Sequence, residues 1–196
     1  MRAYYINLKR RPDRRADQEK QAATLGLDLV RINAIDGKEW DGTGWKKPSK
    51  NEARWRGAAG CYFSHCSALF AAIHLNVFPC MILEDDCVLL EVPVPEPGMV
   101  YLGGYESAKG IYGFHAVMYN TRQDAIDFQT YAKAHKNTID SVANMYRRAN
   151  PDKVKKYSGG GGGGRRFIAL QREGYSDIEC QFLVRSVSGT IHSIPA

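Results

Sequence analysis

Glu84, Asp85 and Asp86 form a run of three acids directly after a short apolar stretch, residues 80–83. The stretch has the length and composition of a fully buried strand, so we expect the acids at its carboxyl end. Ligands of open α/β sheets bind at that edge. Acids are costly to bury unpaired, and hard divalent cations prefer oxygen ligands. The run therefore predicts either a cation-binding cleft or a solvated strand end with its acids turned outward.

A strand, a turn and a helix are predicted at the start of the chain. The strand covers residues 3–8 and the helix covers residues 12–25, because Pro12 suits a first helical turn and a glycine follows residue 25. Arg11 and Arg14 lie at the turn, where they are placed to hold the phosphates of a nucleotide. The alternative is that they are solvated helix residues.

Asp36 lies in an Asp-Gly turn just after a second predicted strand, residues 27–33. An acid at this point of a nucleotide-binding unit is well placed for a ribose hydroxyl or a base edge. The alternative is a plain turn residue. The next segment, residues 38–56, has no periodicity and predicts a loop anchored by tryptophans.

Residues 57–76 are apolar almost all round and predict a buried helix. Its polar interruptions Ser64, His65 and Ser67 lie within one turn, which favours a polar patch facing a ligand. A core histidine bonded to backbone is the alternative for His65.

Three later residues are also able to take part in chemistry. His115 lies on a predicted edge or return strand, residues 113–119. Asp140 lies in the first turn of a predicted helix, where the helix dipole is expected to lower its pKa. Asp177 follows the last predicted strand. Six consecutive glycines, residues 159–164, predict a flexible linker.

Composition favours one folded domain over residues 1–196. Hydrophobic residues make up 44% of the chain and charged residues 24%, which are ordinary globular values. The net charge of +6 and its clustered arginines and lysines suit phosphate-bearing ligands or nucleic acid, or simply a solubilising surface. Five cysteines without paired zinc-ligand spacing predict reduced thiols. We expect a cytoplasmic protein without a signal peptide or transmembrane segment.

Five short motifs occur along the chain: YINLKRRPDR at 5–14, AIDG at 34–37, GC at 60–61 with SH at 64–65, ILEDD at 82–86, and Gln171 with GYSDI at 174–178. Their types, order and spacing resemble those of the family 25 glycosyltransferases, the group of lipopolysaccharide-biosynthesis and collagen galactosyltransferases. The resemblance implies an α/β fold of GT-A type, with a mixed central sheet flanked by helices. The polyglycine run and the short chain depart from the family pattern and affect the acceptor side.

The resemblance also implies the roles of individual residues. Those it assigns to a nucleotide-sugar donor, most often a UDP-sugar, are Asn7, Arg11, Arg14, Asp36, Ser64, His65, Glu84 and Asp85. Asp86 is the expected ligand of Mn²⁺ or Mg²⁺, with His115 to complete the metal shell. Inversion at the sugar carbon, which the family suggests, requires a base for the acceptor's proton. Asp140 is our first candidate for this base and Asp177 our second.

The predicted function is that of a metal-dependent glycosyltransferase, a hexosyl- or pentosyltransferase acting on a hydroxyl acceptor. The acceptor is either a saccharide such as a lipopolysaccharide, or a hydroxymethylated base in DNA, which would make the reaction a DNA modification. The alternative function is a noncatalytic module that binds a nucleotide-sugar or nucleic acid. The sequence does not predict an oligomeric state.

Overall fold

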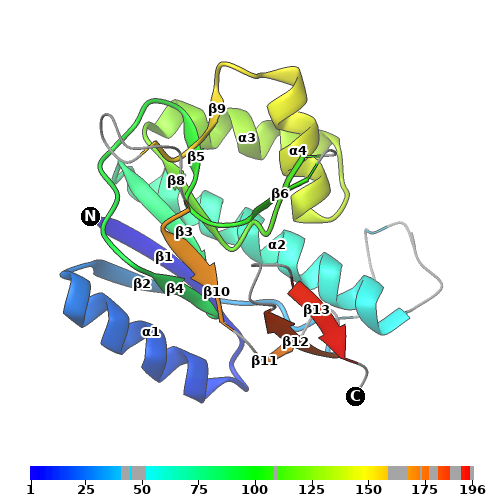
Figure 1. Ribbon diagram of the computed structural model, residues 1–196. Coiled ribbons are helices and arrows are strands. Elements are labelled where there is room, and N and C mark those ends of the chain that lie inside the picture. Colours follow the sequence, from blue (N-terminus) through cyan, green and yellow to red (C-terminus); the bar gives the residue numbers. More distant parts are fainter. Residues whose placement is uncertain are drawn as a thin grey trace.

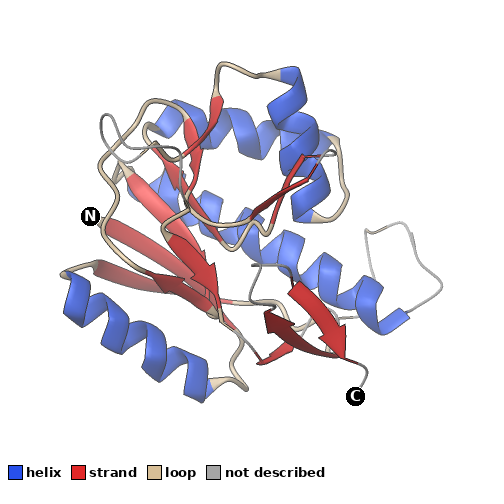
Figure 2. Ribbon diagram, in the orientation of Figure 1, coloured by secondary structure: helices blue, strands red, loops and turns tan. Residues whose placement is uncertain are grey.

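The computed structural model describes residues 1–40, 45, 52–107, 110–158, 167–172, 174–176, 181–185 and 191–194. Its centre is a six-stranded mixed sheet with helices on both faces, which confirms the predicted α/β fold class (Figures 1 and 2). In sheet order the strands are β2 (Asp28–Asn33), β1 (Arg2–Asn7), β3 (Cys80–Glu84), β8 (Ala116–Tyr119), β5 (Met99–Tyr101) and β9 (Val154–Lys156).

The carboxyl ends of β1, β2 and β3 meet at one edge of the sheet because these three strands are parallel. Ile6 pairs with Ile32 on one side and with Glu84 on the other. The polar residues that follow each strand are therefore brought together, although they are far apart in the sequence. Strand β3, which ends at Glu84 and is followed by Asp85 and Asp86, lies in the interior of the sheet.

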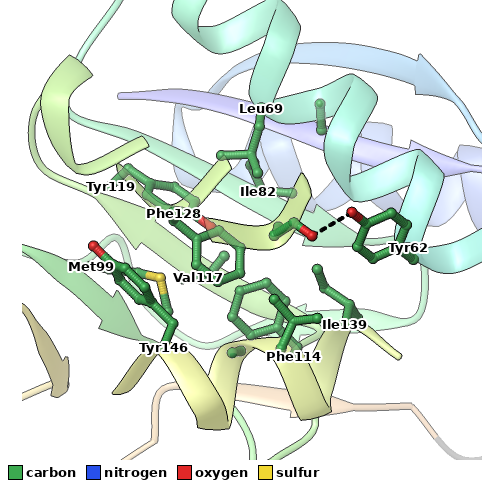
Figure 3. Packing of buried hydrophobic residues seen from close by; sticks show 14 of the residues in the cluster. Tyr62, Leu69, Ile82, Met99, Phe114, Val117, Tyr119, Phe128, Ile139 and Tyr146 are labelled. Carbon is green, nitrogen blue, oxygen red and sulfur yellow. Dashed lines mark hydrogen bonds between the residues drawn. The ribbon is translucent and has the colours of Figure 1, made fainter. Parts of the chain in front are cut away.

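Alternating side chains divide the core into two layers, one on each face of the sheet. Tyr4 and Ile82 belong to the larger layer, while Tyr5 and Met81 belong to the other. This period of two is what a pleated strand buried on both faces requires. Figure 3 shows the larger layer, in which the Tyr62 hydroxyl donates a hydrogen bond of 2.7 Å to a backbone carbonyl oxygen.

Helix α1 (Pro12–Leu25) has the predicted ends and covers the face of the smaller layer. It starts with proline in its first turn, and Gly26 ends it in the left-handed conformation with φ of 63°. Its buried Gln18 donates hydrogen bonds to the carbonyl oxygens of Asp85 and Cys87, at 3.2 and 2.6 Å. The helix is thereby fixed to the acidic end of β3.

Helix α2 (Glu52–Leu75) begins five residues earlier than predicted. The loop prediction for residues 38–56 was therefore wrong at its end, because Trp55 is buried in the core and contacts Trp40. By length and composition α2 is apolar enough to cross a membrane, in contrast to our expectation that no segment is. In the structure it packs against the central sheet and two other helices, and core helices commonly give this signal.

Helices α3 (Arg122–Ala134) and α4 (Ile139–Ala149) both begin at capped residues. Thr121 and Asp124 form a capping box, and the Thr138 side chain caps α4. Strand β8, by contrast, is not an edge strand, since it lies between β3 and β5 and is antiparallel to both. It is the return strand of the prediction, and all four of its residues are buried.

The remaining strands form three small sheets outside the central one. They are β4 (Cys87–Leu89) with β10 (Ala169–Gln171), β6 (Tyr105–Ser107) with β7 (Gly110–Tyr112), and β11 (Gly174–Ser176) with β12 (Gln181–Arg185) and β13 (Ile191–Ile194). The β4–β10 pair carries a late segment of the chain to the end of β3. The predicted linker over residues 159–164 and the candidate base Asp177 lie outside the described residues. The four described cysteines are free thiols.

Candidate functional site

A pocket opens at the edge of the sheet where the parallel strands end. Six residues predicted to form the site line it: Arg14, Asp36, Ser64, Glu84, Asp85 and Asp86. Its wall is completed by the turn after β2, by α2 and by Gln171 from β10. Gly60 allows α2 to approach that turn, because a Cβ atom there would lie 2.5 Å from the carbonyl oxygen of Ile35. One concave site is thus built from the ends of the parallel strands, the close approach of α2 at Gly60, and β10 from late in the chain.

Asp85 is held by an amide and a guanidinium group. The Nδ2 of Asn7 donates to its Oδ2 at 2.7 Å, and Nη1 of Arg14 donates to its Oδ1 at 2.8 Å. Burial raises the pKa of Asp85, and the attraction of Arg14 only partly opposes this rise. The same Arg14 nitrogen lies 3.5 Å from Oδ2 of Asp86. Arg14 is therefore shared between two carboxylates at the pocket wall.

Asp86 is a buried carboxyl group with only 7% of its surface exposed. Its Oδ2 accepts a hydrogen bond of 3.2 Å from Gln171, and its Oδ1 has no hydrogen-bond partner among the described residues. Burial, followed by repulsion from Glu84, raises the pKa of Asp86 to about 7. A buried carboxylate oxygen without a partner among the described residues, close to other carboxylates, is well suited to bind a divalent cation. The cation would offset the repulsion between the neighbouring negative charges.

Glu84 forms a second cluster with two residues of α2. Its Oε1 lies 3.0 Å from Nε2 of His65 and accepts from the Cys61 thiol at 3.4 Å. Burial acts to raise the pKa of Glu84, but the interactions with His65 and then with His115 outweigh it and lower the pKa. Burial, followed by the charge of Glu84, raises the pKa of the Cys61 thiol well above its usual range.

Ser64 and Asp36 also line the pocket, from α2 and from the turn after β2. The Ser64 hydroxyl accepts from the backbone N–H of Ile35 at 2.9 Å and donates to a carbonyl oxygen of its own helix at 2.6 Å. Asp36 pairs with Arg10. Burial is the largest single influence and acts to raise the pKa of Asp36, but the interactions with Arg10 and Lys38 together outweigh it and lower this pKa. Ser67, which we placed in the same patch as Ser64, lies instead on the exposed face of α2.

Asp140 lies in the first turn of α4 and interacts electrostatically with Glu84, although it does not line the pocket. Its Oδ1 accepts hydrogen bonds from the backbone N–H groups of Gly113 and Phe114 at 2.8 and 3.0 Å. The expected lowering of its pKa was wrong, because burial and then repulsion from Glu84 raise it to about 6. Desolvation by tertiary packing outweighs the dipole of one helix end.

Four other predicted residues do not belong to the described pocket wall. Asn7 donates a hydrogen bond to Asp85, and Nε2 of His65 contacts the carboxylate of Glu84, so both hold residues that line the pocket. Arg11 forms an ion pair with its neighbour Asp13 at 2.8 Å. His115 is buried, with Nε2 3.4 Å from a backbone carbonyl oxygen of β10. The predicted role of His115 as a metal ligand beside Asp86 stays a prediction.

Arg10, Cys61 and Gln171 line the pocket without having been assigned a role from the sequence. Two of them had a local signal, since Arg10 adjoins the predicted turn arginines and Cys61 lies one helical turn before His65. Gln171 belongs to the last of the five motifs, but its contact with Asp86, across 85 residues of sequence, was not predicted.

The buried carboxyls predict an unusual dependence of stability on pH. A carboxyl whose pKa is higher in the folded chain binds protons more readily when folded, so stability falls as pH rises from its unfolded to its folded pKa. For Asp86 that range runs from 3.8 to about 7, and for Asp140 from 3.8 to about 6. For Asp86 alone the upper limit of this loss is about 4 kcal/mol.

The measurement is the thermal midpoint of unfolding in a chelator between pH 5 and pH 7.5. We expect the midpoint of the wild type to fall by several degrees across this range, and that of Asp86→Asn to fall less. Manganese should raise the midpoint more at pH 7 than at pH 5. Equal slopes for the two proteins would contradict the assigned burial of Asp86.

The fold and the pocket define an α/β domain that binds ligands at the carboxyl edge of its parallel strands, with carboxylates and arginines at the same site. Comparison with known sequences makes this class more specific. Residues 1–96 match the profile described as glycosyltransferase family 25 (LPS biosynthesis protein). Over residues 1–96 the chain is thus similar to glycosyltransferase family 25, in agreement with the resemblance that the motifs indicated.

Curated relatives are similar to part of the chain. A glycosyltransferase 25 family member of Drosophila pseudoobscura pseudoobscura is 32% identical over 94 residues, which cover 42% of this chain and 15% of the relative. Procollagen galactosyltransferase 2 of Mus musculus is 28% identical over 94 residues, with the same two shares. The chain therefore matches only a small part of the length of these relatives.

Two solved glycosyltransferase structures are also similar. The glycosyltransferase GlyE of Streptococcus pneumoniae TIGR4 has a TM-score of 0.45 at 10% identity, covering 79% of this chain and 44% of that one. A glycosyltransferase involved in the glycosylation of the major capsid of PBCV-1 has a TM-score of 0.47 at 7% identity, covering 80% of each chain.

Proposed function

We propose that the chain is a metal-dependent, inverting glycosyltransferase of GT-A type that moves a sugar from a nucleotide-sugar to a hydroxyl acceptor. The observation that carries this proposal is the coincidence of family and pocket. The matched segment, residues 1–96, contributes every described pocket-lining residue except Gln171. The part of the sequence that defines the family thus builds the site.

The donor is proposed to lie in the pocket with its diphosphate near Arg14 and Arg10. Guanidinium groups bind phosphate oxygens with paired hydrogen bonds, and both arginines line the pocket. Asp36, which lines the same pocket in the turn after β2, is placed for a ribose hydroxyl or a base edge. Because Arg14 already contacts Asp85 and Asp86, donor binding would give this guanidinium a third anionic partner.

A divalent ion, Mn²⁺ or Mg²⁺, is proposed to bind Asp86, with Asp85 beside it. Two observations support this choice: Oδ1 of Asp86 has no hydrogen-bond partner within the described part of the chain, and carboxylates are in surplus around it. Such an ion, when bound, neutralises the charge that develops on a leaving diphosphate. Gln171 orients Asp86 by its hydrogen bond to Oδ2, so the carboxylate is held in place from β10.

Asp140 is the proposed base for the acceptor hydroxyl, in preference to Asp177. Its raised pKa of about 6 keeps it largely ionised at neutral pH while leaving it basic enough to accept a proton. The two backbone N–H groups that bond Oδ1 fix the orientation of the carboxylate, and Oδ2 is the oxygen left for the proton.

The acceptor is proposed to be a saccharide hydroxyl, and the protein to act in the cytoplasm. The alternative acceptor, a hydroxymethylated base in DNA, requires cations free to meet phosphates. Several described cations are instead paired with acids, such as Lys153 with Asp127 at 2.8 Å. Binding to DNA should weaken steeply as salt rises, so undetectable binding even at low salt would exclude the DNA acceptor.

The test of the transferase proposal is release of nucleoside diphosphate from a panel of nucleotide-sugars. We expect release with manganese, faster with a saccharide acceptor, and none with a chelator. The rival is a noncatalytic module that binds the same donors. Donor binding without metal-dependent release, with or without acceptors, would favour that module.

A further inference from the structure

The proposed reaction assigns no role to the cluster formed by Cys61, His65 and Glu84. Cys61 and His65 are four residues apart on α2, so they lie on the same face of the helix. Glu84 meets them from the end of β3. The three ligand atoms, Sγ, Nε2 and Oε1, lie within 4.8 Å of one another. A thiol, an imidazole and a carboxylate therefore converge on one point beside the pocket.

We propose that Cys61, His65 and Glu84 form a binding site for a borderline-soft metal ion, Zn²⁺, separate from the Mn²⁺ or Mg²⁺ position at Asp86. The distances are close to those that zinc requires. Ligand atoms 2.0–2.3 Å from a tetrahedral ion lie roughly 3.3–3.8 Å apart. Here the nitrogen and sulfur atoms lie 3.0 and 3.4 Å from Oε1 of Glu84.

The chemistry of the ligands separates the two sites. Thiolate and imidazole favour zinc, whereas manganese and magnesium favour carboxylate oxygen, which is what Asp85 and Asp86 offer. A thiolate, a carboxylate and a neutral imidazole balance the charge of Zn²⁺. When the zinc–sulfur bond forms, the Cys61 thiol releases its proton to the solvent.

The position of the cluster leaves room for a fourth ligand. Cys61 and Glu84 line the pocket, while the side chain of His65 is 1% exposed and closes the cluster from behind. Three protein ligands and one open position facing a pocket form the arrangement of a zinc site that exchanges its fourth ligand. A water molecule or an anion from the pocket would occupy that position.

The test uses Co²⁺ as a spectroscopic probe for zinc, with the full chain and without donor or manganese. We expect one equivalent of Co²⁺ to give a thiolate-to-cobalt charge-transfer band that Zn²⁺ abolishes. Cys61→Ser should lose the band. Cys66→Ser, on the same helix outside the cluster, should keep it. Glu84→Gln retains the thiol and should weaken zinc binding by at least roughly 10- to 100-fold.

Two results would overturn the proposal. One is a wild-type protein without the band, and the other is a Cys61→Ser variant that keeps it. Circular dichroism of each metal-free variant checks its folding, and the wild-type spectrum decides the question without any variant. The experiment contains no nucleotide-sugar, so a missing band leaves the proposed transferase reaction unaffected, and an inactive transferase still binds zinc.

Discussion

Asp86→Ala should abolish metal-dependent transfer while leaving the protein folded. Asp86 is the proposed ligand of the ion, and its Oδ1 is buried without a partner in the described part of the chain. Loss of the charge that the ion supplies to the leaving diphosphate should lower kcat by at least roughly 10²- to 10³-fold. Steady-state release of nucleoside diphosphate across a manganese titration measures this effect.

The fold should survive this substitution because the carboxyl group is costly to keep ionised at neutral pH. With its pKa at about 7, half of the Asp86 side chains are already protonated there. The thermal midpoint of Asp86→Ala in chelator should therefore not collapse. Asp152→Ala, an exposed acid in a turn, is the matched control and should keep full activity. Full activity of Asp86→Ala in a folded protein would refute the metal assignment.

Asp140→Asn should lower kcat by roughly 10²- to 10⁴-fold, the usual contribution of a general base. Asparagine keeps an acceptor oxygen for the N–H groups of Gly113 and Phe114, so the local structure should persist. Because Asp140 lies outside the described pocket lining, donor affinity measured by calorimetry should change little.

The pH profile separates a base from a structural residue at this position. An acid with a pKa of about 6 must be ionised to accept a proton, so wild-type kcat should fall as pH drops below about 6. The variant should lose this acidic limb along with the rate. If the variant is slow but keeps the limb, another group is the base, and Asp177 becomes the first candidate.

Local signals predicted the parts of the fold that depend on neighbouring residues. Proline at the start of α1 and Gly26 at its end act within one helical turn, and the structure has these boundaries. The apolar run before Glu84 likewise identified an interior strand. The start of α2 was missed because burial of Trp55, a tertiary effect, extends the helix into a polar stretch.

The site was predicted where it depends on strand ends and missed where it depends on distant contacts. Parallel β1, β2 and β3 bring Asp36 and the three acids to one edge, which is what a strand pattern indicates. The pKa of Asp140 was predicted in the wrong direction, because burial depends on packing that the sequence does not display. The contact of Gln171 with Asp86 was missed for the same reason, since it depends on the pairing of β10 with β4.

The most direct test is a crystal structure with manganese and a nucleoside diphosphate, using the anomalous signal of the metal. Our account predicts manganese bonded to Asp86, with the diphosphate beside Arg14 and the nucleoside toward Asp36. Manganese bound away from Asp86, or the nucleotide bound outside this pocket, would contradict it.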